Sequence, residues 1–230
     1  MSNFLMFSHL FLAANKVVIE TGGMSADSVQ LIIEFIGTIA FAISGIRLAA
    51  RKEFDWFGGY VIGLATAIGG GTLRDVMLGQ TPFWMTRSIY IICTGMALVA
   101  VIVFKRHLVR LNITWFLFDT LGLGLFTIAG IQKTLACGFP FWVAIVMGCI
   151  TGAAGGVMRD VLINEIPLIF RKEIYALACI AGGLVYQGCS LLGAGLEITV
   201  ASSFVTVVAV RLLAVKYNIS LPVLKKDDMS

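Results

Sequence analysis

Two charged pairs stand out in an otherwise strongly apolar chain, Arg74-Asp75 and Arg159-Asp160. Both belong to the same motif, Gly-Gly-x-x-Arg-Asp-Val, and both follow a long apolar stretch. A charged side chain in such a stretch is costly to bury, so it usually faces an ionic partner or water. A guanidinium next to a carboxylate offers both signs of charge, which suits the binding of a small zwitterion, whereas for a cation alone the carboxylate is favourable and the arginine is not.

Two further acidic residues accompany these pairs. Glu34 begins the first apolar stretch, and its counterpart Asp119 begins the fourth. We predict two symmetry-related clusters, with Glu34 and Arg74 toward the outer face of a membrane and Asp119 and Arg159 toward the cytoplasmic face. The clusters either lie on a transport path or are structural ion pairs that hold helices together, and the two roles are compatible.

Glycine runs precede both charged pairs, Gly69-Gly70-Gly71 in one case and Ala154-Gly155-Gly156 in the other. Glycines loosen a helix and free backbone carbonyls, which a membrane tolerates only where protein or a water-filled cavity accepts them. We therefore predict a helix break at each run, beside a pore, and a milder break where alanine replaces the first glycine. Close helix packing through small residues is the alternative.

Other reactive residues are few. The five cysteines show no Cys-x-x-Cys pairing and are interpreted as small apolar packing residues. His9 and His107 belong to no metal-binding or catalytic motif, and no Gly-Lys-Ser/Thr follows the triple glycine, which excludes a phosphate-binding loop. We expect no enzyme, no metal site and no cofactor.

The amino-acid composition shows whether the segments that carry these residues lie in water or in lipid. The 230-residue chain is 59% hydrophobic and 13% charged, with a mean hydropathy of +0.95. A soluble domain carries roughly 25% charged residues, so lipid must be the main solvent. The apolar stretches have the length of membrane-spanning helices. We predict an all-α integral membrane protein with seven transmembrane helices, at about 29–50, 57–78, 86–104, 114–135, 140–163, 172–192 and 195–215.

The basic residues predict the orientation. Of the two sets of loops that seven spans create, one holds twelve lysines and arginines, Arg47 and Arg211 among them, and the other only Lys16, Arg87 and Lys133. Positive residues concentrate on the cytoplasmic side, so the N-terminus is predicted outside and the C-terminus in the cytoplasm of a multi-pass inner membrane protein. Because topology explains the net charge of +4, no nucleic-acid partner is expected.

An internal repeat divides the chain. Residues 34–90 match residues 119–175 at 17 of 57 positions without a gap, and the shared charged motif is the best block. Three spans in each copy make the second copy run upside down relative to the first, an arrangement typical of transporters and channels. The predicted divisions are an N-terminal segment (1–28), the first three-helix repeat (29–110), the second inverted repeat (111–193), a seventh helix (194–217) and a cytoplasmic tail (218–230).

The motif AIGGGTLRDV and its echo GAAGGVMRDV resemble those of the prokaryotic trimeric intracellular cation (TRIC) channels and of the related bacterial proteins with a duplicated glycine-transporter domain. The resemblance covers residues 29 to 215. It implies a homotrimer with one pore in each protomer, conducting monovalent cations such as K⁺. Membrane lipid is a further expected partner, since lipid is the main solvent of the chain. The resemblance also implies that Gly69 to Gly71 and Gly155 to Gly156 bend two helices around the pore, near Arg74 and Arg159.

Two functions remain open at this stage. A cation channel would use Asp75, Asp160, Glu34, Asp119 and backbone carbonyls to lower the barrier for cations. A carrier for a small zwitterion such as glycine would use an arginine for the carboxylate and an acidic residue for the ammonium. The channel is the first expectation, on the strength of the resemblance, and the carrier is the alternative.

Overall fold

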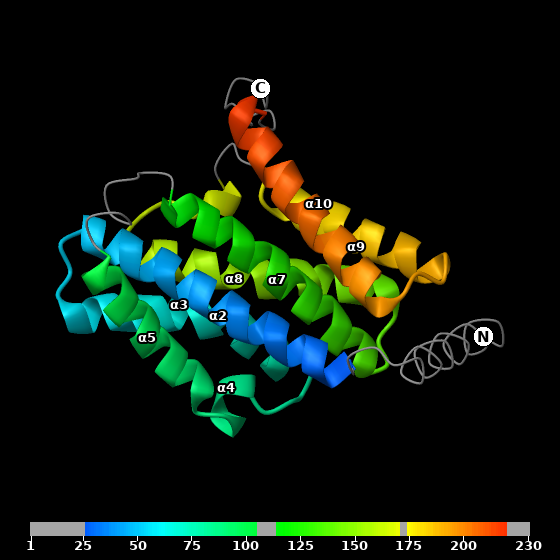
Figure 1. The fold of residues 1–230 in the computed structure, drawn as a ribbon, viewed down its shortest axis with the longest axis horizontal. Helices are drawn as coiled ribbons and strands as arrows, with labels where there is room; N and C mark the ends of the chain where they lie inside the picture. The colour runs from blue at the N-terminus through cyan, green and yellow to red at the C-terminus, as the bar shows by residue number, and fades with distance from the viewer. Residues whose placement is uncertain (1–25, 105–113, 171–173, 220–230) are drawn as a thin grey trace, which may run out of the picture.

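The computed structural model describes residues 26–104, 114–170 and 174–219 (Figure 1). Helices make up these ranges, and no β-strand occurs within them. Most of the predicted N-terminal segment and tail, together with His9 and His107, lie outside the described residues. The helices are α2 (Ala26–Arg51), α3 (Trp56–Met77), α4 (Phe83–Thr86), α5 (Ile89–Val103), α7 (Thr114–Ala136), α8 (Phe141–Leu162), the 3-10 helix η1 (Leu168–Phe170), α9 (Ala176–Leu191) and α10 (Leu196–Lys216).

Each predicted apolar stretch contains one of the longer helices. By length and composition, α2, α7, α8 and α10 are able to cross a membrane, and α5 and α9 are shorter apolar helices. The stretch predicted from residue 86 differs, because the short helix α4 and a turn precede α5. The protein is therefore an all-helical membrane protein, as predicted.

Local signals in the sequence explain where several helices begin and end. Asp55 caps the start of α3, since its Oδ1 accepts a hydrogen bond of 2.7 Å from the backbone N of Gly58. After α3 and α8 the backbone turns through a left-handed residue, Gly79 (φ 67°) and Asn164 (φ 57°) respectively. These two positions are repeat equivalents, so the two helices end in the same way.

Four helices, α2, α3, α7 and α8, form the centre of the molecule. Gln30 near the start of α2 bonds the carbonyl of Ala129 late in α7, whereas Ser44 late in α2 bonds the carbonyl of Trp115 at the start of α7. The two helices therefore run antiparallel. α3 packs against α2 on one side and against α8 on the other.

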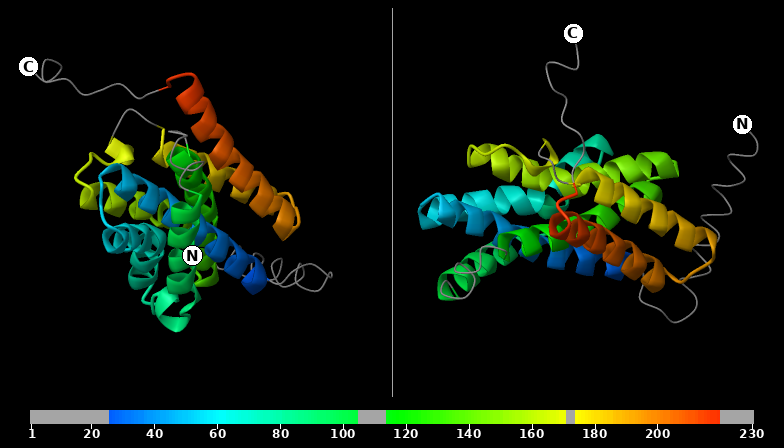
Figure 2. Two further views of the ribbon diagram at one scale, coloured as in Figure 1. Left: turned by 60° about the vertical axis from the view of Figure 1, so that its left-hand side comes forward. Right: turned by 90° about the horizontal axis from the view of Figure 1, so that it is seen from above.

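The remaining helices flank this centre. α5 packs against α2 and α3, and α4 joins α3 to α5. α10 lies along α9 and also contacts α7, so that the two helices form a separate layer at the upper right of Figure 1 and remain side by side when the molecule is turned in Figure 2.

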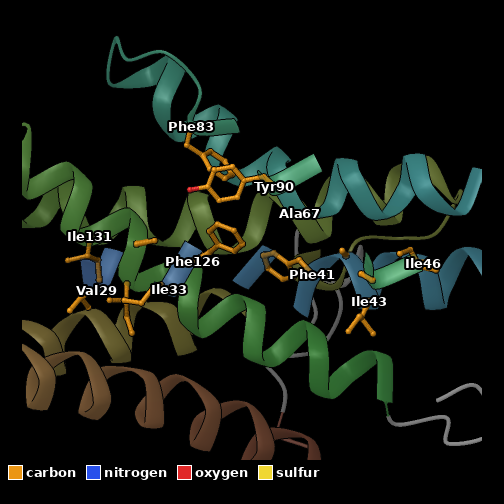
Figure 3. Close-up of a cluster of buried hydrophobic side chains, with 14 of the residues drawn as sticks. Val29, Ile33, Phe41, Ile43, Ile46, Ala67, Phe83, Tyr90, Phe126 and Ile131 are labelled. Carbon is orange, nitrogen blue, oxygen red and sulfur yellow. The ribbon is translucent and has the colours of Figure 1, made fainter. Parts of the chain in front are cut away.

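An aromatic stack occupies the junction of α2 and α7. The rings of Phe41 and Phe126 are 5.3 Å apart and nearly parallel, at 8°. Each ring lies against a glycine of the opposite helix, Phe41 on Gly122 and Phe126 on Gly37. Figure 3 shows Phe83 and Tyr90 continuing this aromatic group from the α4–α5 side. Both stacked rings are almost completely buried.

Candidate functional site

The first cluster forms around Arg74 on α3. The Nη2 of Arg74 lies 3.1 Å from Glu34 Oε1 on α2, and its Nε lies 2.7 Å from Oδ1 of the adjacent Asp75. Arg74 and Asp75 are fully buried, and Glu34 is 4% exposed. The structure therefore joins Glu34 and Arg74, which are 40 positions apart, in one buried ion pair.

Neutral and charged neighbours complete this cluster. The Nζ of Lys133, near the end of α7, lies 2.8 Å from Asp75 Oδ1. Glu34 accepts hydrogen bonds of 3.0 Å from the hydroxyl of Tyr90 and of 2.9 Å from Nε2 of Gln30. The first cluster is defined as Glu34, Arg74, Asp75 and Lys133. The formal charges of these four residues cancel.

The second cluster forms around Arg159 on α8 with matching geometry. Its Nη1 lies 2.6 Å from Asp119 Oδ1 on α7, and its Nε lies 2.8 Å from Asp160 Oδ1. Nη1 also donates a hydrogen bond of 2.8 Å to the hydroxyl of Ser44 on α2. Tyr175, the repeat equivalent of Tyr90, has its hydroxyl 3.5 Å from Asp119 Oδ1.

An arginine from α10 supplies the fourth charge. Arg211 is fully buried, and its Nη2 lies 3.7 Å from Asp119 Oδ2. Its guanidinium also sits over the rings of Phe116, at 4.9 Å, and Tyr175, at 4.6 Å. The second cluster is defined as Asp119, Arg159, Asp160 and Arg211. It is also formally neutral.

The aspartates of the two motifs also have a structural task. Asp75 Oδ2 accepts a hydrogen bond of 2.7 Å from the backbone N of Phe83, and Asp160 Oδ2 accepts one of 3.1 Å from that of Leu168. Each carboxylate thus fixes the loop that follows its helix. Asp75 and Asp160 therefore have a structural role, whether or not they also lie on a transport path.

The predicted helix breaks are wrong. α3 continues through Gly69, Gly70 and Gly71, and α8 through Gly155 and Gly156, without interruption. A Cβ on Gly70 would overlap the carbonyl oxygen of Thr151, and a Cβ on Gly155 that of Thr66. The alternative explanation holds, because these glycines let the backbones of α3 and α8 approach closely. The sequence alone does not distinguish the two roles, because the same run of glycines is compatible with a break in a helix and with close packing of a second helix.

The other glycines of the runs face side chains. A Cβ on Gly69 would meet Met158, and one on Gly71 would meet the ring of Phe83. Around Gly156 the neighbours are polar, with the Tyr175 hydroxyl at 2.9 Å and Asp119 Oδ1 at 3.5 Å from the position of such a Cβ. The second run therefore borders the second cluster directly.

Several basic residues lie inside the helical structure at positions that the sequence does not predict. The distribution of basic residues predicts loop positions on the cytoplasmic side for Arg47 and Arg211, but both are fully buried, in α2 and α10 respectively. Arg47 donates hydrogen bonds to Thr114 Oγ1 from Nε (3.2 Å) and Nη2 (2.8 Å). The same distribution predicts a position in an outer loop for Lys133, which instead lies in the last turn of α7 and contacts Asp75. The internal repeat could have identified the two tyrosines of the clusters, because Tyr90 aligns with Tyr175. For a basic residue near a helix end, the sequence does not show whether the side chain faces the protein interior or the solvent.

Two pockets lie at opposite ends of α2 and α7. The first pocket, of about 660 Å³, is lined by Gln30, Glu34 and Lys133 among others. The second, of about 320 Å³, is lined by Leu48, Trp115 and Asp160 among others. Six of the nine residues lining the second pocket have repeat equivalents that line the first, namely Leu48, Arg51, Trp115, Glu165, Ile166 and Leu168 against Lys133, Ala136, Gln30, Gln80, Thr81 and Phe83.

The cysteines do not form part of either cluster. Cys93 and Cys179 are buried, Cys149 and Cys189 are half-buried, and Cys137 is exposed, all as free thiols. Within the described ranges, no three histidine, cysteine or acidic side chains are grouped as a metal site would require.

Fold and site together define an all-helical integral membrane protein whose centre holds two similarly built, buried clusters of arginine and acidic residues. Sequence comparison agrees with this class. The chain belongs to the family described as Glycine transporter, which matches residues 31–106 and again residues 116–190.

Curated relatives are bacterial membrane proteins. The UPF0126 membrane protein of Vibrio cholerae is 39% identical over 85% of this chain and 82% of the relative. The UPF0126 inner membrane protein YadS of Escherichia coli K12 is 38% identical over 85% of this chain and 96% of the relative.

Solved structures with the same fold are channels. The TRIC trimeric intracellular cation channel orthologue from Rhodobacter sphaeroides has a TM-score of 0.79 and 30% identity, covering 84% of this chain and 100% of the other. A structure described as explaining conductance through TRIC cation channels has a TM-score of 0.75 and 34% identity, covering 84% and 96%. These relatives are channels and membrane proteins rather than enzymes.

Proposed function

We propose that this protein is a K⁺-permeable monovalent cation channel with a pore inside each protomer. The observation that carries the proposal is the pair of pockets at opposite ends of α2 and α7, with equivalent linings and one charged cluster bordering each. The rise from Glu34 to Leu48 is about 21 Å along the axis of α2. Most of a roughly 30 Å hydrocarbon core would thus separate the two pockets.

The proposed topology has seven spans, arranged as two inverted three-helix repeats and a seventh helix, α10. Antiparallel packing of α2 with α7 supports the inversion. So does the reciprocal contact of α3 and α8, in which Gly70 faces Thr151 and Gly155 faces Thr66. The two stretches matched by the family begin 85 positions apart, at residues 31 and 116, which is the offset of the internal repeat.

The proposed path runs between α2, α3, α7 and α8. A cation would enter the first pocket, pass Glu34, Arg74 and Asp75, cross the centre, and leave by Asp119, Arg159 and Asp160. The glycines of both runs would border the central part. There the stacked rings of Phe41 and Phe126 are apolar and almost completely buried, so we propose that the path is closed in this conformation by a hydrophobic gate.

Orientation and assembly complete the proposal. Removing the buried Arg47 and Arg211 from the twelve, and Lys133 from the three, leaves ten basic residues against two, so the N-terminus lies outside and the C-terminus inside. The trimeric relatives suggest a homotrimer surrounded by lipid in the inner membrane. Crosslinking purified protein in mild detergent tests this, and a species no larger than a monomer would contradict it.

Recording from purified protein in a planar bilayer under a KCl gradient tests conduction. We expect unitary currents that reverse near the K⁺ equilibrium potential and that are unchanged by added glycine. A silent bilayer, together with accumulation of labelled glycine in liposomes, would favour the second candidate instead.

That second candidate is a carrier for a small zwitterion such as glycine. The first pocket favours it specifically, because both Glu34 and the cations Lys133 and Arg87 line it and offer partners for an ammonium and a carboxylate. The family description points the same way. The channel ranks first because the solved structures that share the fold are described as cation channels.

A further inference from the structure

Two glutamine side chains line the first pocket, Gln30 on α2 and Gln132 on α7. The Oε1 atom of each is buried and accepts no hydrogen bond from the residues that the structure describes. A buried carbonyl oxygen without a donor is unusual in a folded protein. The ion pairs of the first cluster give these two oxygens no role, so they point to a ligand of the pocket.

The orientation of the Gln30 amide is fixed by its nitrogen. Nε2 donates hydrogen bonds to Glu34 Oε1 at 2.9 Å and to the carbonyl oxygen of Ala129 at 3.4 Å. Both of these oxygens are acceptors, so the nitrogen must face them and Oε1 must face away. The Gln30 amide therefore offers a ligand an oxygen, while its two N–H groups are engaged.

The packing of α2 on α7 brings the two glutamines to the same end of the pair of helices. Gln30 contacts Ala129, and Gln132 lies almost one turn beyond Ala129 on the same face of α7. Asp27, Gln30 and Glu34 share one face of α2 at positions i, i+3 and i+7, and all three line the first pocket. Oxygen atoms thus extend from the exposed Asp27 to the buried Glu34.

The two pockets differ in this chemistry. The repeat equivalent of Gln30 is Trp115, which lines the second pocket, and that of Gln132 is the buried Arg47. An indole and a guanidinium have hydrogen-bond donors only and offer no oxygen. None of the described residues that line the second pocket is a glutamine or an asparagine. The amide oxygens therefore belong to one end of the molecule.

We propose that the first pocket binds a monovalent alkali cation such as K⁺, with Gln30 Oε1 and Gln132 Oε1 as ligands. Oxygens of carbonyl type replace the water around such an ion. The Glu34 carboxylate supplies a negative charge one turn further in, and neutral amide ligands still allow the ion to leave. This inference rests on the proposed channel function and identifies where an entering cation would exchange water for protein oxygens.

The test measures K⁺ binding through stability. The melting temperature of purified protein in detergent is recorded in a KCl titration, with N-methylglucamine chloride holding the ionic strength constant. We expect K⁺ to raise the melting temperature of the wild type. Gln30→Leu should need roughly tenfold more K⁺ for half of that rise, the equivalent of about 1.4 kcal/mol in cation binding. A wild type that K⁺ does not stabilise would overturn the inference.

Gln187→Leu is the matched control. Gln187 Oε1 is also buried and accepts no hydrogen bond from the described residues, but Gln187 does not line the first pocket. This variant should keep the K⁺ dependence of the wild type. An equal loss of K⁺ dependence in Gln30→Leu and Gln187→Leu would contradict a site in the first pocket.

Variants of Gln132 separate binding from a purely structural role. Gln132→Leu should weaken K⁺ binding as Gln30→Leu does, and it serves in its place if Gln30→Leu does not fold. Gln132→Glu keeps an oxygen at this position and adds a negative charge, so half of the rise should need less K⁺ than in the wild type. If the amides were only structural, these variants would lower the melting temperature equally in both salts, and that result would refute the site.

Recordings in a planar bilayer distinguish this inference from the channel proposal. A silent bilayer contradicts the channel, yet K⁺ stabilisation that Gln30→Leu weakens and Gln187→Leu preserves would still support the site. Unitary K⁺ currents with the same K⁺ dependence of stability in Gln30→Leu as in the wild type would overturn the site and leave the channel intact. Glycine is titrated in N-methylglucamine chloride as a third arm. Stabilisation by glycine and not by K⁺ would overturn the assignment to an alkali cation and favour the carrier.

Discussion

The two buried arginines at the centre of the clusters, Arg74 and Arg159, are each neutralised by neighbouring carboxylates. Arg74 and Arg159 are fully buried, and each contacts two carboxylates within 3.1 Å. Breaking a buried ion pair by removing one member leaves the other uncompensated, which costs more than the intact pair contributes. We therefore expect both clusters to be needed for folding, whatever part they take in permeation.

Arg159→Ala tests this requirement. The variant removes the guanidinium that contacts both Asp119 and Asp160, so we expect a loss of about 3–5 kcal/mol in the free energy of unfolding and little folded protein. Size-exclusion chromatography and thermal melting in detergent measure the effect. Arg74→Ala should behave alike, and Arg87→Ala, at an exposed position, is the control for folding. Normal folding and transport in both variants would contradict the cluster interpretation.

The aromatic stack makes a second prediction at the residue scale. Phe126→Ala removes the ring that lies against Phe41 and Gly37 and so opens the proposed hydrophobic gate between the two pockets. We expect higher K⁺ flux together with a loss of about 3–5 kcal/mol in stability. Phe57→Ala is the control, because Phe57 is 74% exposed. Unchanged flux in a folded Phe126→Ala protein would argue against a gate at this position.

At the scale of elements, glycines decide how closely the central helices pack. Gly70 and Gly155 hold the backbone of α3 against that of α8, and the helices remain continuous there. The reciprocal contacts mean that both copies of the repeat contribute equally to this seam. A side chain at either position has no room.

Gly155→Ala should be destabilising despite the higher helix propensity of alanine. The added Cβ would overlap the Thr66 carbonyl, and overpacking of this kind costs about 1–3 kcal/mol. Gly188→Ala on α9 is the matched control, because nothing lies within 4 Å of its added Cβ. There we expect unchanged or slightly higher stability. Equal melting temperatures for the two variants would refute the packing explanation.

At the scale of the whole molecule, orientation is the property that the fold alone does not fix. Cys137 follows α7 and is the exposed one of the five free cysteines. In the proposed orientation it lies outside, so a membrane-impermeant maleimide should label it in intact spheroplasts. Cys137→Ala should abolish the labelling.

A second site provides the comparison. Glu53, the repeat equivalent of Gly138, follows α2 on the opposite side and is exposed. In the Cys137→Ala background, Glu53→Cys should be labelled only after the cells are made permeable. The reverse pattern at the two sites would show that the N-terminus lies in the cytoplasm.

The sequence by itself determined the class of the protein and the pairing within each repeat. Apolar stretches of helical length require lipid as solvent, and the 85-residue offset places Glu34 with Arg74 and Asp119 with Arg159 as equivalent sets. A duplicated pattern constrains its two copies to the same local structure, so the sequence alone predicts this equivalence.

Only the tertiary structure decided which helices meet and what their small and charged residues face. It gave the glycine runs a packing role where a break was predicted, brought Lys133 and Arg211 into the clusters, and placed Phe41 against Phe126. The physical reason is that periodicity defines the face of a helix, whereas its partner depends on the packing of all helices at once. A lysine or arginine near a helix end fits equally well in a loop or in a buried ion pair.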